Sequence, residues 1–181
     1  PCSYIPDREA RTRFFYGIDI SATDDLRLLN DGWRRSGIIV YRPVCEQCHR
    51  CLQIRIPVAE FIQSNSQQRT FRRNQDLQVW TTPDLTWEPA IKLYQDYQVR
   101  WHQQDFEPDT EDVRRFLGIT PVETWLMLYC LPDTEHLVGA GWIDVLPDGI
   151  SSVYFAFDVD QSRRRLGVFS ILMEIELAKK L

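Results

Sequence analysis

The sequence predicts an α+β (α/β) protein with a mostly antiparallel sheet and a small, cysteine-containing N-terminal domain. Its 181 residues are 44% hydrophobic, which is enough to bury a substantial core and too apolar for a disordered chain. The first 75 residues are dense in Arg, Cys and turn residues, whereas the later segments are longer and more regular. We therefore expect two domains, at residues 1–75 and 76–181.

The N-terminal domain is predicted to be irregular, with short elements. The apolar run from Ile38 to Tyr41 suits a strand. Residues 64–74 are polar and basic and show no apolar periodicity, so they are predicted to form a surface loop that leads into the second domain.

The second domain is predicted to begin with two helices. Apolar residues spaced by three and four predict an amphipathic helix over residues 87–104, at Ile91, Tyr94, Tyr97 and Trp101. A shorter helix is expected over residues 110–117, because acidic residues in its first turn suit the helix dipole.

Three strands and a last helix are predicted to follow. The strands are expected at residues 123–130, 137–146 and 150–158, and the short turns at Pro132-Asp133 and 147–149 imply an antiparallel meander. An Arg-rich turn over residues 162–167 then leads into a helix. The face of that helix is predicted to be Val168, Ile171, Leu172, Ile175 and Ala178.

The net charge of −5 is unevenly distributed. Residues 1–80 carry 12 Arg and 9 acidic residues, whereas residues 81–181 carry 9 basic and 17 acidic residues. Of the 21 basic residues 18 are Arg, whose planar guanidinium binds phosphate and carboxylate groups in pairs of hydrogen bonds. Phosphate or carboxylate partners are favoured for the N-terminal half. The alternative is that the excess of Arg over Lys reflects the general amino-acid composition of proteins in the source organism.

The cysteines suggest a metal site. Cys45, Cys48 and Cys51 are spaced by three, and Cys2 is a candidate fourth ligand, so four soft sulfurs could hold zinc or an iron–sulfur cluster. His49 could replace a thiolate, and reduced, unliganded cysteines are the alternative. Five cysteines argue against a simple disulfide framework, and Cys130 is predicted to be a core residue.

Two further segments could bind anions. Arg34 and Arg35 lie between glycines and are followed by Arg42, an arrangement that suits either bidentate carboxylate binding or an ordinary solvated turn. Arg163, Arg164 and Arg165 precede Gly167 where the last helix is expected to begin, and free N–H groups at a helix N-terminus attract anions. A surface-exposed basic cap is the alternative for this segment.

Several reaction classes are excluded. The sequence has no Gly-x-Ser-x-Gly elbow, no P-loop and no His-Glu-x-x-His motif, and its three histidines are scattered. It also has no apolar run of eighteen residues and no signal-like N-terminus, which predicts a soluble, cytoplasmic protein.

The element order of the second domain resembles the core of the N-acetyltransferase (GNAT) superfamily. Several motifs in order also resemble one family of aminoacyl-tRNA-protein transferases, the bacterial aspartate/glutamate leucyltransferases and their arginyl-tRNA-protein transferase relatives. These motifs are CSYIPDREART (2–12), GWRRSG (32–37), YRPVCEQCHRC (41–51), IRIPV (54–58), RRN (72–74), DVLPDGISSVY (144–154) and the Leu166-Gly167 turn.

The resemblance implies an enzyme that adds leucine from leucyl-tRNA to the N-terminal Asp or Glu of proteins and so marks them for degradation by the N-end rule. Aminoacyl-tRNA and proteins or peptides with N-terminal Asp or Glu are the expected partners, without a membrane. An arginyltransferase with the same acceptors and a non-catalytic, metal-dependent tRNA-binding or sensor module are the alternatives.

Residue roles follow from this resemblance as hypotheses. Asp144 or Tyr154 is expected near the reacting amine, where it would assist proton transfer. Arg34, Arg35 and Arg42 are expected to hold the acceptor carboxylate. The residues expected to face tRNA phosphates are Arg72, Arg73, Arg163, Arg164, Arg165 and Gly167.

The chain departs from this family in two places. The family continues past the last helix with a further strand, whereas this sequence stops at Leu181, so the acyltransferase-like domain is expected to lack its C-terminal end. Where the family has Arg-His, Arg100 is followed by Trp101 and then His102, so no role is assigned to that histidine.

Overall fold

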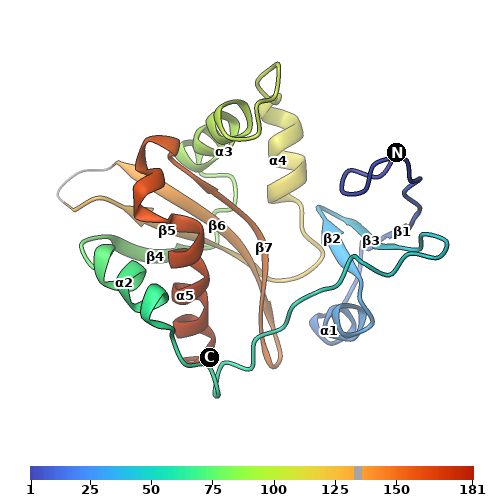
Figure 1. Ribbon diagram of the computed structural model, residues 1–181, viewed down its shortest axis with the longest axis horizontal. Coiled ribbons are helices and arrows are strands. Elements are labelled where there is room, and N and C mark those ends of the chain that lie inside the picture. The colour runs from blue at the N-terminus through green and yellow to red at the C-terminus, as the bar shows by residue number, and fades with distance from the viewer. Residues whose placement is uncertain (133–135) are drawn as a thin grey trace.

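Two antiparallel sheets organise the computed structural model, which describes residues 1–132 and 136–181 (Figure 1). The first sheet has the order β1-β3-β2 and consists of β1 (Thr12–Tyr16), β2 (Arg34–Ser36) and β3 (Ile39–Pro43). The second has the order β4-β5-β6-β7 and consists of β4 (Gln78–Thr82), β5 (Thr124–Cys130), β6 (Leu137–Leu146) and β7 (Gly149–Phe157). The protein is therefore a mixed α+β structure.

Six helical segments accompany the sheets within residues 1–132 and 136–181. They are α1 (Ala22–Asn30), α2 (Asn65–Arg73), α3 (Glu88–Arg100), α4 (Thr110–Gly118), the 3-10 helix η1 (Val159–Arg164) and α5 (Leu166–Ala178). In the described part of the chain, none of them is both long enough and apolar enough to span a bilayer.

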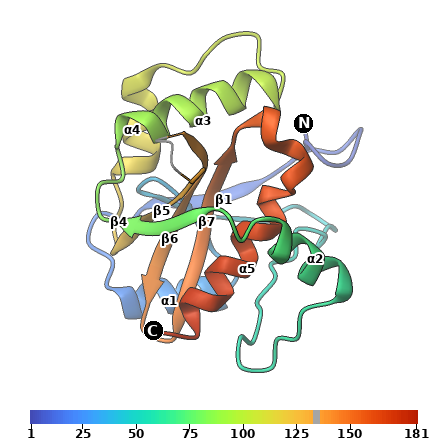
Figure 2. The same ribbon diagram turned by 90° about the vertical axis from the view of Figure 1, so that its left-hand side faces the viewer.

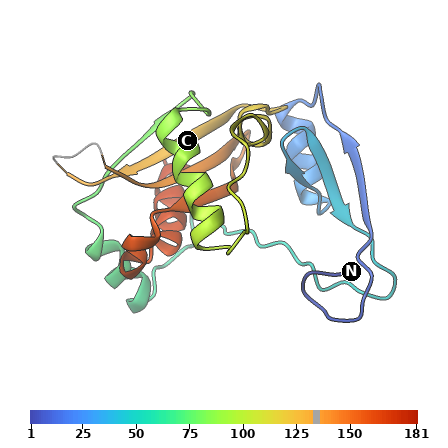
Figure 3. The ribbon, with the colours of Figure 1, turned by 90° about the horizontal axis from the view of Figure 1, so that it is seen from above.

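The elements gather into two lobes that Figure 3 shows apart, joined by the extended segment 44–64. We call β1–β3 with α1 the N-terminal lobe and α2 through α5 the C-terminal lobe. In the C-terminal lobe, α3 and α4 cover one face of the sheet and α5 covers the other (Figures 1 and 3). Tyr94 of α3 meets Trp142 and Tyr154 on the first face, and Phe169 of α5 meets Tyr129 on the second.

Most predicted elements of the C-terminal lobe are confirmed. The helices predicted over residues 87–104 and 110–117 are α3 and α4, and the three predicted strands are β5, β6 and β7 in an antiparallel meander. The turn predicted at Pro132-Asp133 extends into residues outside the described part of the chain. The Arg-rich turn takes the form of η1, which ends at Arg165 in the left-handed conformation.

The prediction of a loop over residues 64–74 was wrong, because this segment is α2. Ser64 and Gln67 form a reciprocal capping box, in which each side chain accepts a hydrogen bond from the backbone N–H of the other. The short apolar face of α2 packs on α5, where the rings of Phe71 and Phe169 lie 6.0 Å apart (Figure 2). α2 falls before residue 75, yet its contacts lie in the C-terminal lobe.

The predicted face of the last helix was also partly wrong. Ile171 is 46% exposed, whereas Leu166 and Phe169 are buried. The helix begins at Leu166, and residues 166, 169 and 172 share one face at a spacing of three, so this face meets the sheet.

The lobes touch where the β2–β3 turn meets the C-terminal end of α4. Gly37 has φ +58°, and a Cβ there would lie 3.4 Å from the carbonyl oxygen of Arg115 and 3.5 Å from that of Phe116. Glycine therefore serves both the positive φ of the turn and the close approach of the lobes.

Candidate functional site

A buried ion pair joins the two lobes. Arg35 of β2 donates from Nε to Asp144 Oδ2 of β6 at 2.6 Å, and its Nη2 donates to Asp144 Oδ1. Thr124 Oγ1 donates to the same Oδ1 at 2.7 Å. The side chains of Arg35 and Asp144 are only 5% and 2% exposed. Both oxygens of Asp144 and one edge of the Arg35 guanidinium are thus occupied within the protein, so neither group faces a substrate in this arrangement.

A second carboxyl group lies beside this pair. Asp25 of α1 is 4% exposed, and its Oδ2 has no hydrogen-bond partner among the described residues. Burial, followed by the nearby Asp144, raises the pKa of Asp25, while Arg35 and Arg34 act in the opposite direction. The lobe interface therefore holds two acidic groups and relies on arginine for compensation.

The other two arginines of the predicted acceptor site make fewer hydrogen bonds within the protein than Arg35 does. Arg34 is half-buried and makes no hydrogen bond or ion pair through its side chain with any described residue. The Arg42 guanidinium lies 4.9 Å from the ring centroid of Trp33, and its Nη1 donates to the Asp31 carbonyl at 3.5 Å. Of the three predicted residues, Arg34 and Arg42 retain hydrogen-bonding capacity for an outside carboxylate.

Tyr154 lies on the same face of the sheet as Asp144. Tyr154 pairs with Trp142, two residues before Asp144 on β6, and the register shift after Trp142 leaves Val153 as an extra residue in β7. Gln98 Nε2 of α3 donates to Tyr154 Oη at 2.5 Å. Burial raises the pKa of Tyr154, so its hydroxyl group stays protonated at neutral pH. Because Gln98 donates to the oxygen, the hydroxyl proton remains available to another acceptor.

Arginines from two distant segments meet on one surface. Arg73 Nη1 of α2 donates to the Arg163 carbonyl at 2.6 Å, and Arg165 Nη1 donates to Ser66 Oγ at 3.2 Å. Arg69 adjoins both Arg72 and Arg73 on the surface of α2, because it lies three and four residues before them. We call the exposed side chains of Arg69, Arg72, Arg73, Arg163 and Arg165 the arginine surface.

Arg164 differs from its neighbours because its guanidinium is used within the protein. Its Nη1 and Nη2 donate to the two oxygens of Asp76 at 2.9 Å, and its Nε donates to Gln161 at 3.1 Å. These hydrogen bonds lower the pKa of Asp76. Arg164 therefore ties η1 to the segment between α2 and β4, whereas Arg163 and Arg165 project outward.

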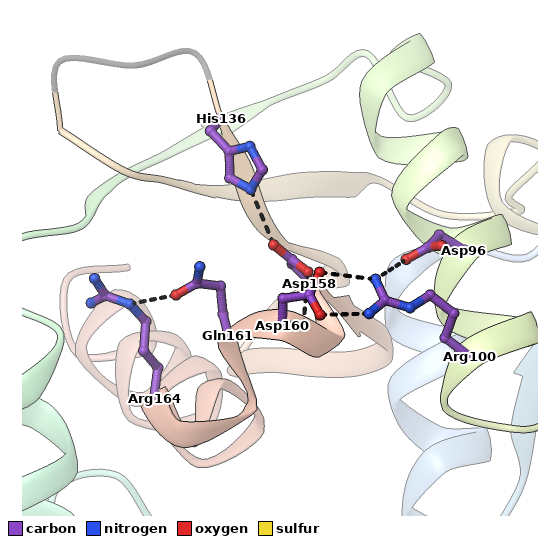
Figure 4. A network of polar contacts seen from close by, with 7 residues as sticks. All are labelled: Asp96, Arg100, His136, Asp158, Asp160, Gln161 and Arg164. Carbon is purple, nitrogen blue, oxygen red and sulfur yellow. Dashed lines mark hydrogen bonds and ion pairs between the residues drawn. The ribbon is translucent and has the colours of Figure 1, made fainter.

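A polar network fixes η1 on its other side (Figure 4). Asp158 accepts from the Asp160 backbone N–H at 3.0 Å and lies 3.1 Å from His136 Nε2. Arg100 of α3 donates to Asp160 at 2.6 Å and to Asp96 at 3.3 Å, and the Arg100 hydrogen bond lowers the pKa of Asp160. The network holds η1 in place, so the outward arginines stand on a fixed turn.

Gly167 lies in the first turn of α5, which has no side-chain cap. A Cβ at Gly167 would meet no atom within 4 Å, so the position is open to solvent. The N-terminal end of α5 thus adjoins the arginine surface.

The cysteines do not form a metal site as they are placed. Cys2, Cys45 and Cys48 are half-buried, Cys51 is exposed, and all are free thiols. Within residues 1–132 and 136–181, no three His, Cys, Asp or Glu side chains gather closely enough to hold a metal ion. Cys45 Sγ instead accepts from the Arg11 backbone N–H at 3.3 Å. Cys130 is buried in the core, as predicted.

The N-terminal segment does approach the cysteine loop. Ile5 and Arg8 line a cavity of about 250 Å³ together with residues 47–50. Backbone hydrogen bonds from Tyr4 and Ile5 lower the pKa of Cys2. The segment is thus near the loop, but the sulfurs do not converge on one point.

Sequence reasoning missed Glu174, a buried acid on α5. Its side chain is 6% exposed, and Ser152 Oγ of β7 donates to its Oε1 at 3.3 Å. Burial raises the pKa of Glu174 to about 7, against the opposing effect of the Ser152 hydrogen bond. Glu174 follows the buried Ser170 by four residues, so the two share a face, but both are polar and this face shows no apolar periodicity that would have predicted its burial.

Comparison with known proteins gives consistent matches over the chain. The N-terminal family model described as "Arginine-tRNA-protein transferase, N terminus" matches residues 1–69, and its C-terminal counterpart matches residues 89–181. The chain is 37% identical to an aspartate/glutamate leucyltransferase of Saccharophagus degradans, over 99% of this chain and 77% of that protein. It is 37% identical to the protein of that name from Marinobacter nauticus, over 99% and 76%, and 36% identical to that from Acinetobacter baumannii, over 99% and 67%.

Proposed function

Because the chain belongs to the arginine-tRNA-protein transferase family, we propose that it transfers leucine from leucyl-tRNA to the N-terminal Asp or Glu of a protein. Leucine is the donor that the names of the matched relatives indicate, and Asp and Glu are their named acceptors. Charged tRNA and acidic N-termini are then the partners, and the cytoplasm, where tRNA is charged, is the expected location.

The arginine surface is the structural observation that supports this proposal best. Its five exposed guanidinium groups come from α2 and from the η1–α5 junction, some 90 residues later in the chain. Phosphates are the natural ligands of such a surface, because arginine binds them bidentately and releases counterions from the nucleic acid. The surface stands out in a chain whose net charge is −5.

The reaction requires little covalent chemistry from the protein. The acceptor's α-amino nitrogen attacks the ester carbonyl carbon, the bond from that carbon to the ribose oxygen breaks, and an amide forms. The amine loses a proton and the ribose oxygen gains one. An α-amino group has a pKa of about 8, so part of it is neutral at physiological pH without a dedicated base. Positioning two bound substrates then supplies much of the acceleration.

Tyr154 is the residue we place at the reacting ester. Its protonated hydroxyl, oriented by Gln98, would donate to the carbonyl oxygen as negative charge develops there, or to the departing ribose oxygen. Asp144 acts on the reaction through Arg35 and the lobe contact, as a positioning residue. The expectation from the sequence was that Asp144 or Tyr154 assists proton transfer near the reacting amine; this proposal keeps Tyr154 at the reacting groups and gives Asp144 the positioning role.

The acceptor carboxylate is assigned to the N-terminal lobe. Arg34 and Arg42 would hold the Asp or Glu side chain, while Arg35 keeps its bond to Asp144.

The two lobes correspond to an N-terminal cysteine-containing domain and an acyltransferase domain. The four-stranded sheet with α3 and α4 on one face and α5 on the other supports a GNAT-like core for the latter.

We keep Cys2, Cys45, Cys48 and Cys51 as the candidate ligands of zinc or an iron–sulfur cluster. Binding of zinc or an iron–sulfur cluster at Cys2, Cys45, Cys48 and Cys51 would require the loop to rearrange, since the described residues offer no set of three ligands. Metal and sulfide analysis after anaerobic purification tests for such a rearrangement.

The test is transfer of labelled leucine from leucyl-tRNA to a peptide that begins with Asp. We expect transfer to the Asp peptide and none to a matched peptide that begins with Ala. Arginyl-tRNA in place of leucyl-tRNA tests the donor: equal or faster arginine transfer would assign the chain to the arginine users. Binding of tRNA without transfer from either donor would contradict the enzyme assignment and indicate a binding module.

A further inference from the structure

The loop after α3 folds back onto the last turn of that helix. Gln103 has φ +56°, in the left-handed region that often ends helices, and the next backbone N–H, that of Gln104, donates to the Gln98 carbonyl at 3.3 Å. The Trp101 N–H donates to the Tyr97 carbonyl at 3.0 Å in the same turn. Main-chain contacts therefore hold Gln104 beside Gln98, independently of the side chain at position 104.

Two glutamine side chains connect this loop to Tyr154. Gln104 Nε2 donates to Gln98 Oε1 at 3.0 Å, and Gln98 Nε2 donates to Tyr154 Oη at 2.5 Å. Gln98 is buried, whereas Gln104 is exposed. A line of hydrogen bonds thus runs from the exposed loop to the hydroxyl group that we place at the reacting ester.

The direction of this line determines what the Tyr154 hydroxyl can do. In the observed direction Gln98 turns its NH₂ group toward Tyr154, so the hydroxyl oxygen accepts and its proton stays free. In the reverse direction Gln98 would present Oε1 to Tyr154 and accept that proton itself. A donor at position 104 favours the first direction, because the buried Oε1 then has a partner only when it points away from Tyr154.

We propose that Gln104 is a positioning residue for the transfer: by donating to Gln98, it keeps the hydroxyl proton of Tyr154 available to the reacting ester. The inference rests on the proposed function, in which this proton is donated to the carbonyl oxygen or to the departing ribose oxygen. Gln104 touches neither oxygen and acts only through Gln98.

Two substitutions of Gln104 set the direction of the line in opposite ways. Gln104→Glu offers only an acceptor, so Gln98 must turn its NH₂ group toward it and its Oε1 toward Tyr154. Gln104→Lys offers only donors and keeps the observed direction. Gln103→Glu and Gln103→Lys are the matched controls, because they place the same charges at the neighbouring exposed position, whose side chain has no hydrogen bond within the described residues. Thermal unfolding verifies that each variant is folded.

The first measurement is the kinetics of leucine transfer to a peptide that begins with Asp. We expect kcat of Gln104→Glu to lie about ten-fold or more below that of Gln103→Glu with similar KM, and Gln104→Lys to retain kcat within about two-fold of Gln103→Lys. In the Tyr154→Phe background, Gln104→Glu should lower kcat no further than Gln103→Glu does. Equal losses for Gln104→Glu and Gln104→Lys, or the same loss with and without the hydroxyl group, would overturn the proposal.

The second measurement needs no transfer and follows exchange of the Tyr154 hydroxyl proton with solvent, by NMR of 13C-labelled tyrosine assigned with Tyr154→Phe. Exchange should slow in Gln104→Glu, where Gln98 accepts the proton, and should match the wild type in Gln104→Lys and both Gln103 variants. If the wild type transfers leucine and exchange is the same in every variant, the role of Gln104 is overturned and the proposed function stands. If exchange slows as expected but the wild type transfers no leucine, the contact of Gln104 with Gln98 stands and the proposed function fails.

Discussion

Ionisation of Glu174 should lower the free energy of unfolding of the protein. In the folded protein its pKa is about 7, against an ordinary value of 4.5. Between these pH values the folded state holds a proton that the unfolded state has released, so the free energy of unfolding falls as pH rises through this window. We expect a loss on the order of 3 kcal/mol between pH 4.5 and pH 7.5 from this residue, measured by urea unfolding.

Glu174→Gln separates this contribution from other titrating groups, because glutamine keeps an acceptor for Ser152 and does not ionise. The variant should lose less stability than the wild type over the same pH range. Glu176→Gln is the matched control on the same helix, since Glu176 forms a surface ion pair with Lys179. Parallel pH curves for wild type and Glu174→Gln would show that the acid is not responsible.

Asp144 should be more important for stability than for chemistry. Asp144→Asn leaves the Arg35 guanidinium buried without its counter-charge, which typically costs 3–5 kcal/mol, so we expect a loss of about this size in urea unfolding. The double variant Arg35→Met with Asp144→Leu removes both charges and should recover much of the loss. If Asp144→Asn is as stable as the wild type, Arg35 and Asp144 do not form this buried ion pair in solution.

Tyr154→Phe should affect turnover and leave binding nearly unchanged. Loss of a donor to a developing oxyanion typically lowers kcat by about 100-fold or more, with little change in KM. Tyr94→Phe is the matched control, because Tyr94 lies beside Tyr154 with its ring 5.1 Å away and has no hydroxyl hydrogen bond among the described residues. Equal kinetics for Tyr154→Phe and wild type would remove Tyr154 from the reacting ester.

At the residue scale, the sequence identified charged residues better than it identified their partners. Arg35 and Asp144 were both selected, but 109 positions separate them in the chain and no local pattern predicts that they meet. The environment of Glu174 depends on β7 passing beneath α5, which is a tertiary fact. Residue type therefore predicted the kind of chemistry, whereas the pairing required the fold.

At the scale of elements, the N-terminal end of α2 should control the arginine surface. Ser64→Ala removes the side-chain acceptor of the capping box and should cost about 1 kcal/mol of unfolding free energy. Because Arg69, Arg72 and Arg73 lie on this helix, the variant should also weaken tRNA binding modestly. Ser3→Ala, at an exposed position in the N-terminal segment, is the control for both measurements. Unchanged stability would show that the cap contributes nothing in water.

The capping box also explains which elements could be predicted. The strands β5 to β7 have near-continuous apolar runs and turn residues between them, so their existence and order followed from the sequence. α2 has only a weak apolar face, with Thr70 buried and Phe71 half-buried, and its remaining residues are polar. Its helix depends on the cap and on packing against α5, neither of which shows as apolar periodicity.

For the molecule as a whole, the positions of the charged residues on the folded protein determine binding of a polyanion more than the net charge does. The chain has a net charge of −5, yet the acidic residues beside the arginine surface are largely neutralised within the protein, as Asp76 is by Arg164 and Asp160 by Arg100. Arginines that pair with no acidic side chain among the described residues, such as Arg163, remain for an outside polyanion. Folding thus separates paired arginines from unpaired ones.

This separation predicts different effects for two adjacent residues. Affinity for tRNA should fall linearly with the logarithm of salt concentration, and Arg163→Ala should reduce that slope by about 1, because one phosphate contact is lost. Arg164→Ala should leave the slope unchanged and lower the unfolding temperature instead, since its guanidinium is bonded to Asp76. Equal slopes for Arg163→Ala and wild type would mean that phosphates bind elsewhere. A reduced slope for Arg164→Ala would mean that tRNA displaces Asp76, so that the paired arginines also serve the nucleic acid.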